Sequence, residues 1–247
     1  MLLLSLAQAA PPLQELPHGQ VDWTRGVLIV QSSGSPNTGA WSDLGVAEKD
    51  AYGQLELRVQ DSSARIAFDA DRSAGDLLGG GDELARSLTE AQGNWRIAET
   101  RYNASGRVDM RAELDLQPWL RAALVAQAQG DPDLKLTPTE RSGLVVDARK
   151  VGGRPCFAPR LVDPEGLQIY GASTLSAEMA ASRSPALWVA DPAQTEAGEL
   201  AGLEPLFVVA VDADGCDLVL SAQDSLTVRA LASTSVLAEA HVVLVVE

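Results

Sequence analysis

The sequence has few of the residues on which nucleic-acid binding depends. Aromatic residues make up 4% of the 247 residues, and 34 acidic side chains against 19 basic ones give a formal net charge of −15. Proteins that bind nucleic acid present basic surfaces, and those that bind single strands add aromatic platforms for the bases. A field of this sign repels phosphate backbones and anionic lipid surfaces. The composition therefore excludes nucleic acid as a partner.

Residue clusters typical of catalytic, cofactor and metal sites are also missing from the sequence. It has only two histidines, His18 and His241, and two cysteines, too few for a zinc site at the usual spacings. His241 has apolar neighbours and no nucleophile at a fixed spacing, so we interpret it as a structural histidine. The glycine triplet at 79–81 lacks the Lys and Ser/Thr of a P-loop and predicts a turn before a helix. We expect no catalytic residue, no cofactor-binding residue and no metal ligand, and we predict that the protein is not an enzyme.

Acidic residues offer two weaker alternatives. The segment DADGCD at 212–217 has the look of a calcium loop, but an EF-hand needs a longer series of ligands that ends in Glu. A hairpin turn accounts for its Asp and Gly residues equally well. A pair of carboxylates could serve a hydrolase, but such a pair forms in space and sequence spacing cannot reveal it.

The cysteines, Cys156 and Cys216, both lie in the second half of the chain. In an exported protein they could form a disulfide, which would close a loop of about 60 residues and stabilise the fold by about 4 kcal/mol. Two separate buried thiols are the alternative, and the sequence leaves both open.

The N-terminus predicts export. Residues 1–10, MLLLSLAQAA, form an apolar run followed by Ala-Gln-Ala, the pattern of the end of a secretory signal, although the run is short and lacks a basic start. It is too short to cross a bilayer, and we expect no transmembrane segment. We therefore predict a periplasmic or outer-membrane-associated protein, with residues 11–19 as an unstructured Pro-rich linker.

Hydrophobic periodicity predicts an α+β fold of two small domains, at 20–129 and 140–247, joined by a linker at 130–139. Each domain should be an antiparallel sheet of hairpins packed against one or two helices. Alternating runs predict strands, several of them joined by turn-forming residues, and apolar residues at helical spacing predict helices. The predicted strands lie at 21–30, 64–70, 94–102, 107–116, 143–149, 156–163, 167–171, 206–211, 216–220 and 240–246. The predicted helices lie at 41–59, 82–91, 118–129, 174–181 and 221–232, with loops at 32–39 and 191–202.

Two groups of motifs resemble a known family. VDWTRGVLIV at 21–30, AEKDA at 47–51 and VDMRAELDL at 108–116 resemble the N-terminal domain of LPP-type envelope lipoproteins, a group that includes the flagellum-associated FlgP. GLVVDAR and RPCFAPRLVDPEGLQIYG, between 143 and 171, resemble a C-terminal extension of longer relatives from Gram-negative bacteria. The resemblance implies an α+β envelope protein without catalytic residues, with a scaffolding role near the flagellar motor or outer membrane. No cysteine lies near the predicted cleavage site, so the lipid anchor of that family is not predicted here.

These observations favour an exported, non-catalytic protein with a structural role. Its expected partners are envelope or flagellar proteins or a second copy of itself, and strand addition at a sheet edge is a reasonable mode of contact. The alternative is a periplasmic ligand-binding module for a glycan or small envelope molecule, which requires a concave apolar pocket with convergent polar groups.

Overall fold

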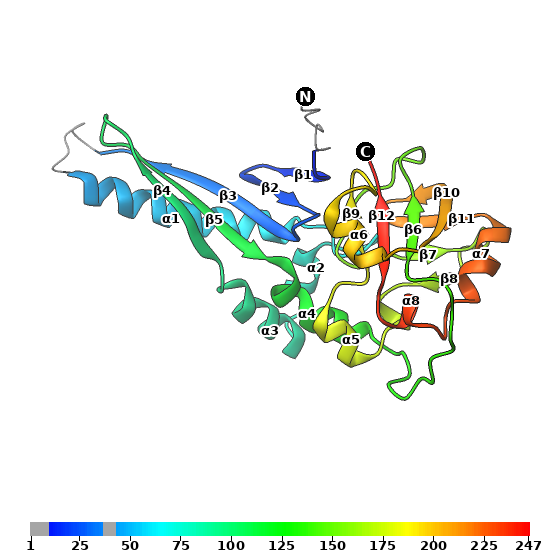
Figure 1. Ribbon diagram of the computed structural model, residues 1–247. Coiled ribbons are helices and arrows are strands. Elements are labelled where there is room, and N and C mark those ends of the chain that lie inside the picture. The colour runs from blue at the N-terminus through cyan, green and yellow to red at the C-terminus, as the bar shows by residue number, and fades with distance from the viewer. Residues whose placement is uncertain (1–9, 37–42) are drawn as a thin grey trace, which may run out of the picture.

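The computed structural model describes residues 10–36 and 43–247, and it has the predicted α+β fold, with two sheets and their associated helices (Figure 1). The molecule is elongated. The first sheet extends away as an arm, and the second sheet lies at the other end (Figure 1). Residues 1–9 of the predicted signal and Trp41 of the first predicted helix lie outside the described residues. In the described part, no helix is both long and apolar enough to cross a membrane.

The first sheet is antiparallel throughout and has the order β1-β2-β3-β5-β4. Its strands are β1 (Leu13–Leu16), β2 (Gly19–Asp22), β3 (Val27–Gly34), β4 (Arg96–Tyr102) and β5 (Val108–Asp115). The predicted hairpin of 94–102 and 107–116 is confirmed as β4 and β5, which turn through Gly106 at φ 79°. A left-handed conformation suits glycine, which has no Cβ to clash.

Four helices accompany this sheet: α1 (Leu44–Ala64), α2 (Ala74–Leu78), α3 (Glu83–Gln92) and α4 (Leu116–Gln127). The predicted helical spacing is confirmed in α1, where Ala47, Ala51, Leu55 and Val59 are all buried. This row of small and medium side chains lies along β3 and β5. Asp82 caps α3 by accepting a hydrogen bond from the Ala85 N–H at 2.8 Å.

Four predictions in the first half are wrong. The Pro-rich segment 11–19 is not an unstructured linker, because β1 within it pairs with β2. The single strand predicted at 21–30 is two strands separated by a turn at Trp23–Gly26, and β3 continues to Gly34 inside the predicted loop at 32–39. The strand predicted at 64–70 is replaced by the end of α1 and one isolated bridge between Ala67 and Ser73. The pairing of β3 with the distant β5 explains why β3 continues into the predicted loop.

The second sheet is mixed, with the order β8-β7-β11-β10-β6-β12-β9. Its strands are β6 (Leu144–Asp147), β7 (Leu161–Val162), β8 (Gln168–Tyr170), β9 (Leu187–Val189), β10 (Leu206–Asp214), β11 (Asp217–Leu220) and β12 (Val242–Val245). The two predicted hairpins are confirmed as antiparallel pairs, β7 with β8 and β10 with β11.

The expected all-antiparallel arrangement of this second sheet is wrong. The interior strand β6 runs parallel to both β10 and β12, and β12 runs parallel to β9. Parallel strands are covered on both faces and are apolar without alternation. All four residues of β12 are buried, and three of the four in β6. The apolar segments VVLV in β12 and LVVD in β6 have this pattern, which is typical of parallel strands.

Four α-helices and a short 3₁₀ helix surround the second sheet. They are η2 (Ala172–Thr174), α5 (Ala177–Ser182), α6 (Thr195–Ala201), α7 (Ala222–Arg229) and α8 (Ser235–Ala238). Ser221 caps α7 through the Asp224 N–H at 3.1 Å, as its position predicts. The loop predicted at 191–202 is wrong, since α6 forms there and packs Ala197 and Ala201 over Val145 and Val243.

The two halves are joined by a continuous hydrophobic core. Most core residues of both sheets form one cluster, and the rings of Phe68 and Phe157 lie 6.1 Å apart within it. The backbone N–H groups of Phe157 and Ala158 donate to the carbonyls of Ala67 and Phe68, at 3.1 and 2.7 Å. The segment after α1 is therefore hydrogen-bonded directly to the second half.

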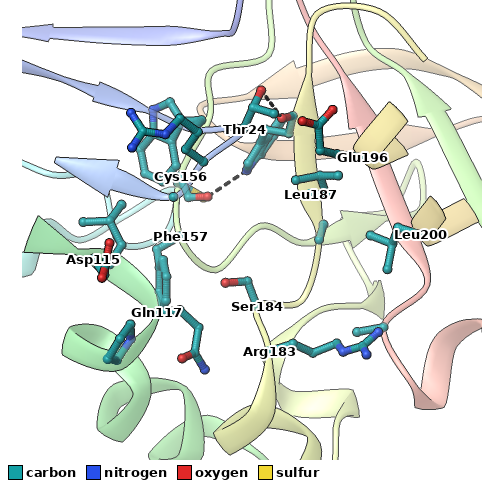
Figure 2. Close-up of a pocket in the computed structure, with 18 of the residues that line it drawn as sticks. Thr24, Asp115, Gln117, Cys156, Phe157, Arg183, Ser184, Leu187, Glu196 and Leu200 are labelled. Atoms are coloured by element: carbon teal, nitrogen blue, oxygen red, sulfur yellow. Dashed lines mark hydrogen bonds between the residues drawn. The ribbon is translucent and has the colours of Figure 1, made fainter. Parts of the chain in front are cut away.

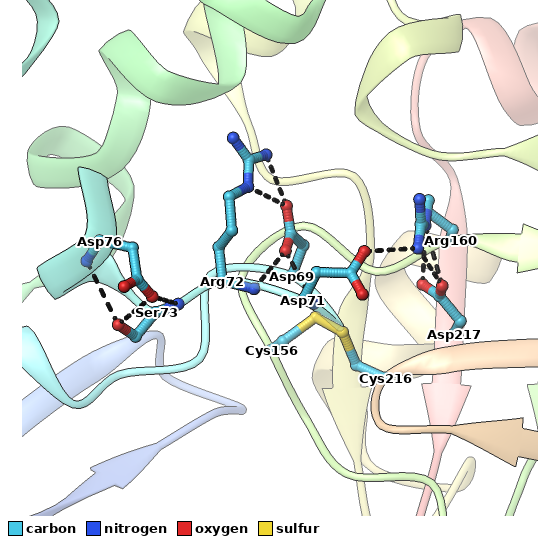
Figure 3. A network of polar contacts seen from close by, with 9 residues as sticks. All are labelled: Asp69, Asp71, Arg72, Ser73, Asp76, Cys156, Arg160, Cys216 and Asp217. Atoms are coloured by element: carbon cyan, nitrogen blue, oxygen red, sulfur yellow. Dashed lines mark hydrogen bonds and ion pairs between the residues drawn. A yellow bond between two sulfur atoms is a disulfide. The ribbon is translucent and has the colours of Figure 1, made fainter. Parts of the chain in front are cut away.

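Polar contacts reinforce this junction (Figure 3). The Arg160 Nε lies 2.9 Å from both carboxylate oxygens of the buried Asp217, and its Nη2 lies 3.4 Å from Asp71 of the first half. The hydrogen bonds to Asp217 raise the pKa of the Arg160 guanidinium above its usual value. Cys156 and Cys216 form a disulfide beside this network, with their Cα atoms 5.8 Å apart. The structure thus decides between the two alternatives for the cysteines.

Candidate functional site

A cavity of about 650 Å³ opens between the two halves of the molecule. The turn between β2 and β3 and the start of α4 line it from the first half, and β9, α6 and the segment before β9 line it from the second (Figure 2). Ligand sites are typically concave, of this size, and preferentially located between domains. This cleft is the candidate site.

The floor of the cleft is apolar because core side chains reach it from both halves. Trp23, Leu116, Phe157 and Trp188 line it, and each is at most 5% exposed. Leu187 lies beside them on β9 (Figure 2). Little of these four side chains faces the cleft, and the partly buried Ala186 and Leu187 supply its more accessible apolar surface.

Charged groups from both halves surround this floor. Arg25 and Asp115 come from the first half, and the second contributes Arg183, Glu196 and Glu199. Arg25 lies 3.5 Å from the buried Glu113. The Arg183 Nη1 donates to the Glu239 carbonyl at 3.1 Å, and no carboxylate pairs with its guanidinium among the residues that the structure describes. The rim thus offers charges of both signs to a ligand.

One hydrogen-bond donor on the cleft wall lacks an acceptor. The Trp188 Nε1 donates to the Cys156 carbonyl at 2.8 Å, whereas the Trp23 Nε1 has no partner in the described part of the chain. Buried polar groups are almost always paired, so an orphan indole N–H needs a reason. This nitrogen is itself buried, so the N–H is an unpaired donor of the core and is not open to a ligand in the cleft.

The residues that we considered for catalysis and metal binding from the sequence lie in different parts of the structure. His241 lies on the cleft wall, 3.8 Å from Glu239, while its backbone carbonyl accepts from the Leu144 N–H at 2.8 Å. DADGCD is the turn of the β10–β11 hairpin, with Gly215 at φ 60°, as the alternative to a calcium loop predicted. Across the described ranges, no group of three His, Cys, Asp or Glu side chains could hold a metal ion. Cys156 also lines the cleft.

Sequence reasoning missed the cleft itself. Thr24 and Trp188 meet there although they are 164 residues apart, and the Thr24 Oγ1 donates to the Trp188 carbonyl at 3.0 Å (Figure 2). A single sequence carries no signal for such a pairing. The tryptophans lie on predicted helices and strands, and we interpreted that placement as a sign of core positions and not of a cleft.

Comparison with known proteins gives one family match. Residues 143–247 match the family described as Treponema pallidum Tp0624, second domain. The match covers less than half of the chain and spans every strand of the second sheet. No curated protein matches the chain. The family match indicates likeness in this part of the sequence and carries no activity with it.

Proposed function

We propose that this protein is an exported, non-catalytic binding protein of the cell envelope, which holds its ligand in the cleft between its two halves. The observation that carries the proposal is the composition of the cleft, an apolar floor beneath charged groups that both halves supply. The disulfide supports export, because such bonds persist in oxidising compartments.

Filling the cleft should weaken binding. Ala186 lines the cleft and is only partly buried, so a tryptophan in its place would extend into the cavity. We expect Ala186→Trp to weaken binding at least tenfold, measured by calorimetry with two probes. The probes are oligosaccharides of N-acetylated amino sugars and a library of short peptides.

The matched control for this variant is Ala104→Trp, which adds the same side chain to the exposed turn at the far end of the arm (Figure 1). It should bind as the wild type does. If Ala186→Trp fails to fold, Ser184→Trp tests the same wall. Equal binding by the folded cleft variant and the wild type, or no binding of either probe, would contradict the proposal.

A second candidate function, scaffolding through protein contacts, is favoured by a separate surface. Phe207, Val209 and Val211 alternate along β10 and are all more than half exposed. They form an apolar row on the outer face of the second sheet. Exposed apolar patches frequently mark interaction sites. Envelope or flagellar proteins, or a second copy of the chain, are the expected partners of a scaffold.

The scaffold candidate predicts a change in assembly when this row becomes charged. We expect Val209→Asp to reduce self-association, measured by sedimentation velocity. It should also remove the in-cell cross-links that a photo-crosslinking residue placed at position 207 forms. Leu226→Asp is the control, since Leu226 is a single exposed leucine on α7 with a similar exposed fraction of 66%. A wild-type protein that is monomeric and forms no cross-link would contradict scaffolding by this row.

A further inference from the structure

The strand β4 forms an open edge of the first sheet. It is the last strand in the sheet order and pairs only with β5 in the part of the chain that the structure describes. It lies on the arm, which extends away from the second sheet (Figure 1). Most of its residues are exposed, including Ile97 at 42% and Tyr102 at 49%. Another strand could therefore reach this edge.

The turn of the β4–β5 hairpin shows which backbone groups lie on the open side. The Asn103 N–H donates to the Arg107 carbonyl at 2.9 Å, and the Asn103 carbonyl accepts from the Gly106 N–H at 2.9 Å. Asn103 therefore bonds toward β5. Because backbone groups of successive strand residues point alternately to the two sides, those of Tyr102 and Thr100 point away from β5. Within the described ranges, these outward N–H and C=O groups have no hydrogen-bond partner.

Two opposite charges lie on this edge, two residues apart. The Arg101 Nε lies 2.6 Å from the Glu99 Oε1, and the two side chains are 72% and 38% exposed. Exposed ion pairs of this kind are weak, so both groups are available to a second partner. Charged residues on an edge strand discourage most incoming strands. A strand that pairs here needs the matching order of charges.

We propose that β4 is a dimerisation edge, to which a second copy of the chain adds its own β4 in antiparallel orientation. With the two-fold axis at Thr100, Glu99 of each copy lies opposite Arg101 of the other, and the two threonines face each other. Opposite charges and paired threonines across antiparallel strands are both favourable. An axis one residue away, at Glu99 or Arg101, would place like charges opposite each other. Charge complementarity thus selects one register, and this contact is separate from the cleft.

Exposed apolar side chains beside this edge give the second copy a surface to cover. Ile97 and Tyr102 lie on the face of β4 that α1 borders, and the Tyr102 hydroxyl donates to Glu48 of that helix at 3.3 Å. Tyr52 of α1 is 45% exposed, and its ring lies 5.6 Å from that of Trp95, the residue before β4. Exposed apolar patches frequently mark interaction sites. A strand added to β4 would lie next to this patch.

Sedimentation velocity of the full chain, from about 1 μM to about 1 mM, tests the inference over the range expected for a short edge contact. Glu99→Arg alone and Arg101→Glu alone each place like charges opposite each other, so each should weaken self-association about tenfold or more. An equimolar mixture of the two variants places two arginines opposite two glutamates and should associate as a heterodimer. Arg141→Glu changes an exposed arginine before β6 and should associate as the wild type does.

Hydrogen exchange measured by NMR tests the register. We expect the Thr100 amide to exchange more slowly as the dimer forms, and the Arg101 amide, which faces β5, to remain unchanged. If the charge variants fail to fold, Thr100→Pro serves in their place. It removes an outward N–H and no bond to β5, a position at which edge strands tolerate proline.

The outcomes decide between this edge and the other surfaces. A wild-type chain that stays monomeric over this range overturns the inference, and so does a mixture that associates no better than either charge variant. An association that Val209→Asp removes and Glu99→Arg leaves intact would place the contact on β10, and the β4 inference would fall. Ligand binding in the cleft is measured separately with Ala186→Trp, so neither result depends on the other.

Discussion

Removal of the Cys156–Cys216 disulfide is expected to lower the free energy of unfolding by about 4 kcal/mol, because the cross-link closes a long loop in the unfolded chain. The two cysteines are 60 residues apart in sequence. Denaturant titration of the oxidised protein, with and without a thiol reductant, measures the loss. The matched variant is Cys156→Ala/Cys216→Ala, in which alanine replaces both cysteines because their side chains are buried. That variant should have the lower stability and no response to the reductant.

The same experiment examines the junction between the halves. The residues after Cys156, Phe157 and Ala158, donate their backbone N–H groups to the carbonyls of Ala67 and Phe68. We expect these two amides to exchange faster with solvent once the disulfide is reduced. Unchanged stability under a reductant that demonstrably cleaves the bond would show that the loop is held by packing alone.

A methyl group at Gly34 is expected to destabilise the protein by about 3 kcal/mol, the upper end of the usual cost of overpacking. A Cβ at this position would lie 1.9 Å from the Ala47 carbonyl oxygen and 2.6 Å from the Ala51 nitrogen. Both are backbone atoms of α1, so the helix would have to move away from β3. Thermal and chemical unfolding of Gly34→Ala measure this effect.

Gly53→Ala is the matched control because it adds the same methyl group to α1 itself. A Cβ at Gly53 meets nothing within 4 Å. Alanine in a helix interior is more stable than glycine by about 1 kcal/mol, so this variant should gain stability. The two substitutions are expected to have opposite signs. A similar loss from both would mean that α1 does not lie on β3 at Gly34.

These two glycines also show where sequence reasoning succeeds and where it stops. Gly53 lies in a helix whose apolar spacing was evident, and the helix formed despite the glycine. Gly34 belongs to a Gly/Ser-rich stretch that predicts a loop, yet it ends β3 and pairs with Val108. Turn-forming composition gives the propensity of a segment, while the partner strand and the helix above it determine its conformation.

Interactions between residues close in sequence are enough to specify the hairpins, the capped helices and the α+β class. Turn residues and period-two alternation predict β4 with β5, β7 with β8 and β10 with β11, since those strands are neighbours along the chain. The parallel neighbours of β6 are a different case. They lie about 60 and 100 residues further along, and several buried apolar strands could take either place.

Most local elements, the acidic charge and the two cysteines as a candidate pair can be read from the sequence. The mixed sheet, the bond between those cysteines and the cleft follow only from the three-dimensional fold. The cleft depends on Thr24 meeting Trp188 and on Phe157 meeting Phe68, contacts between halves that fold from separate stretches of chain. Such contacts arise because both halves bury apolar surface against each other, and burial carries no directional signal in the sequence of either half.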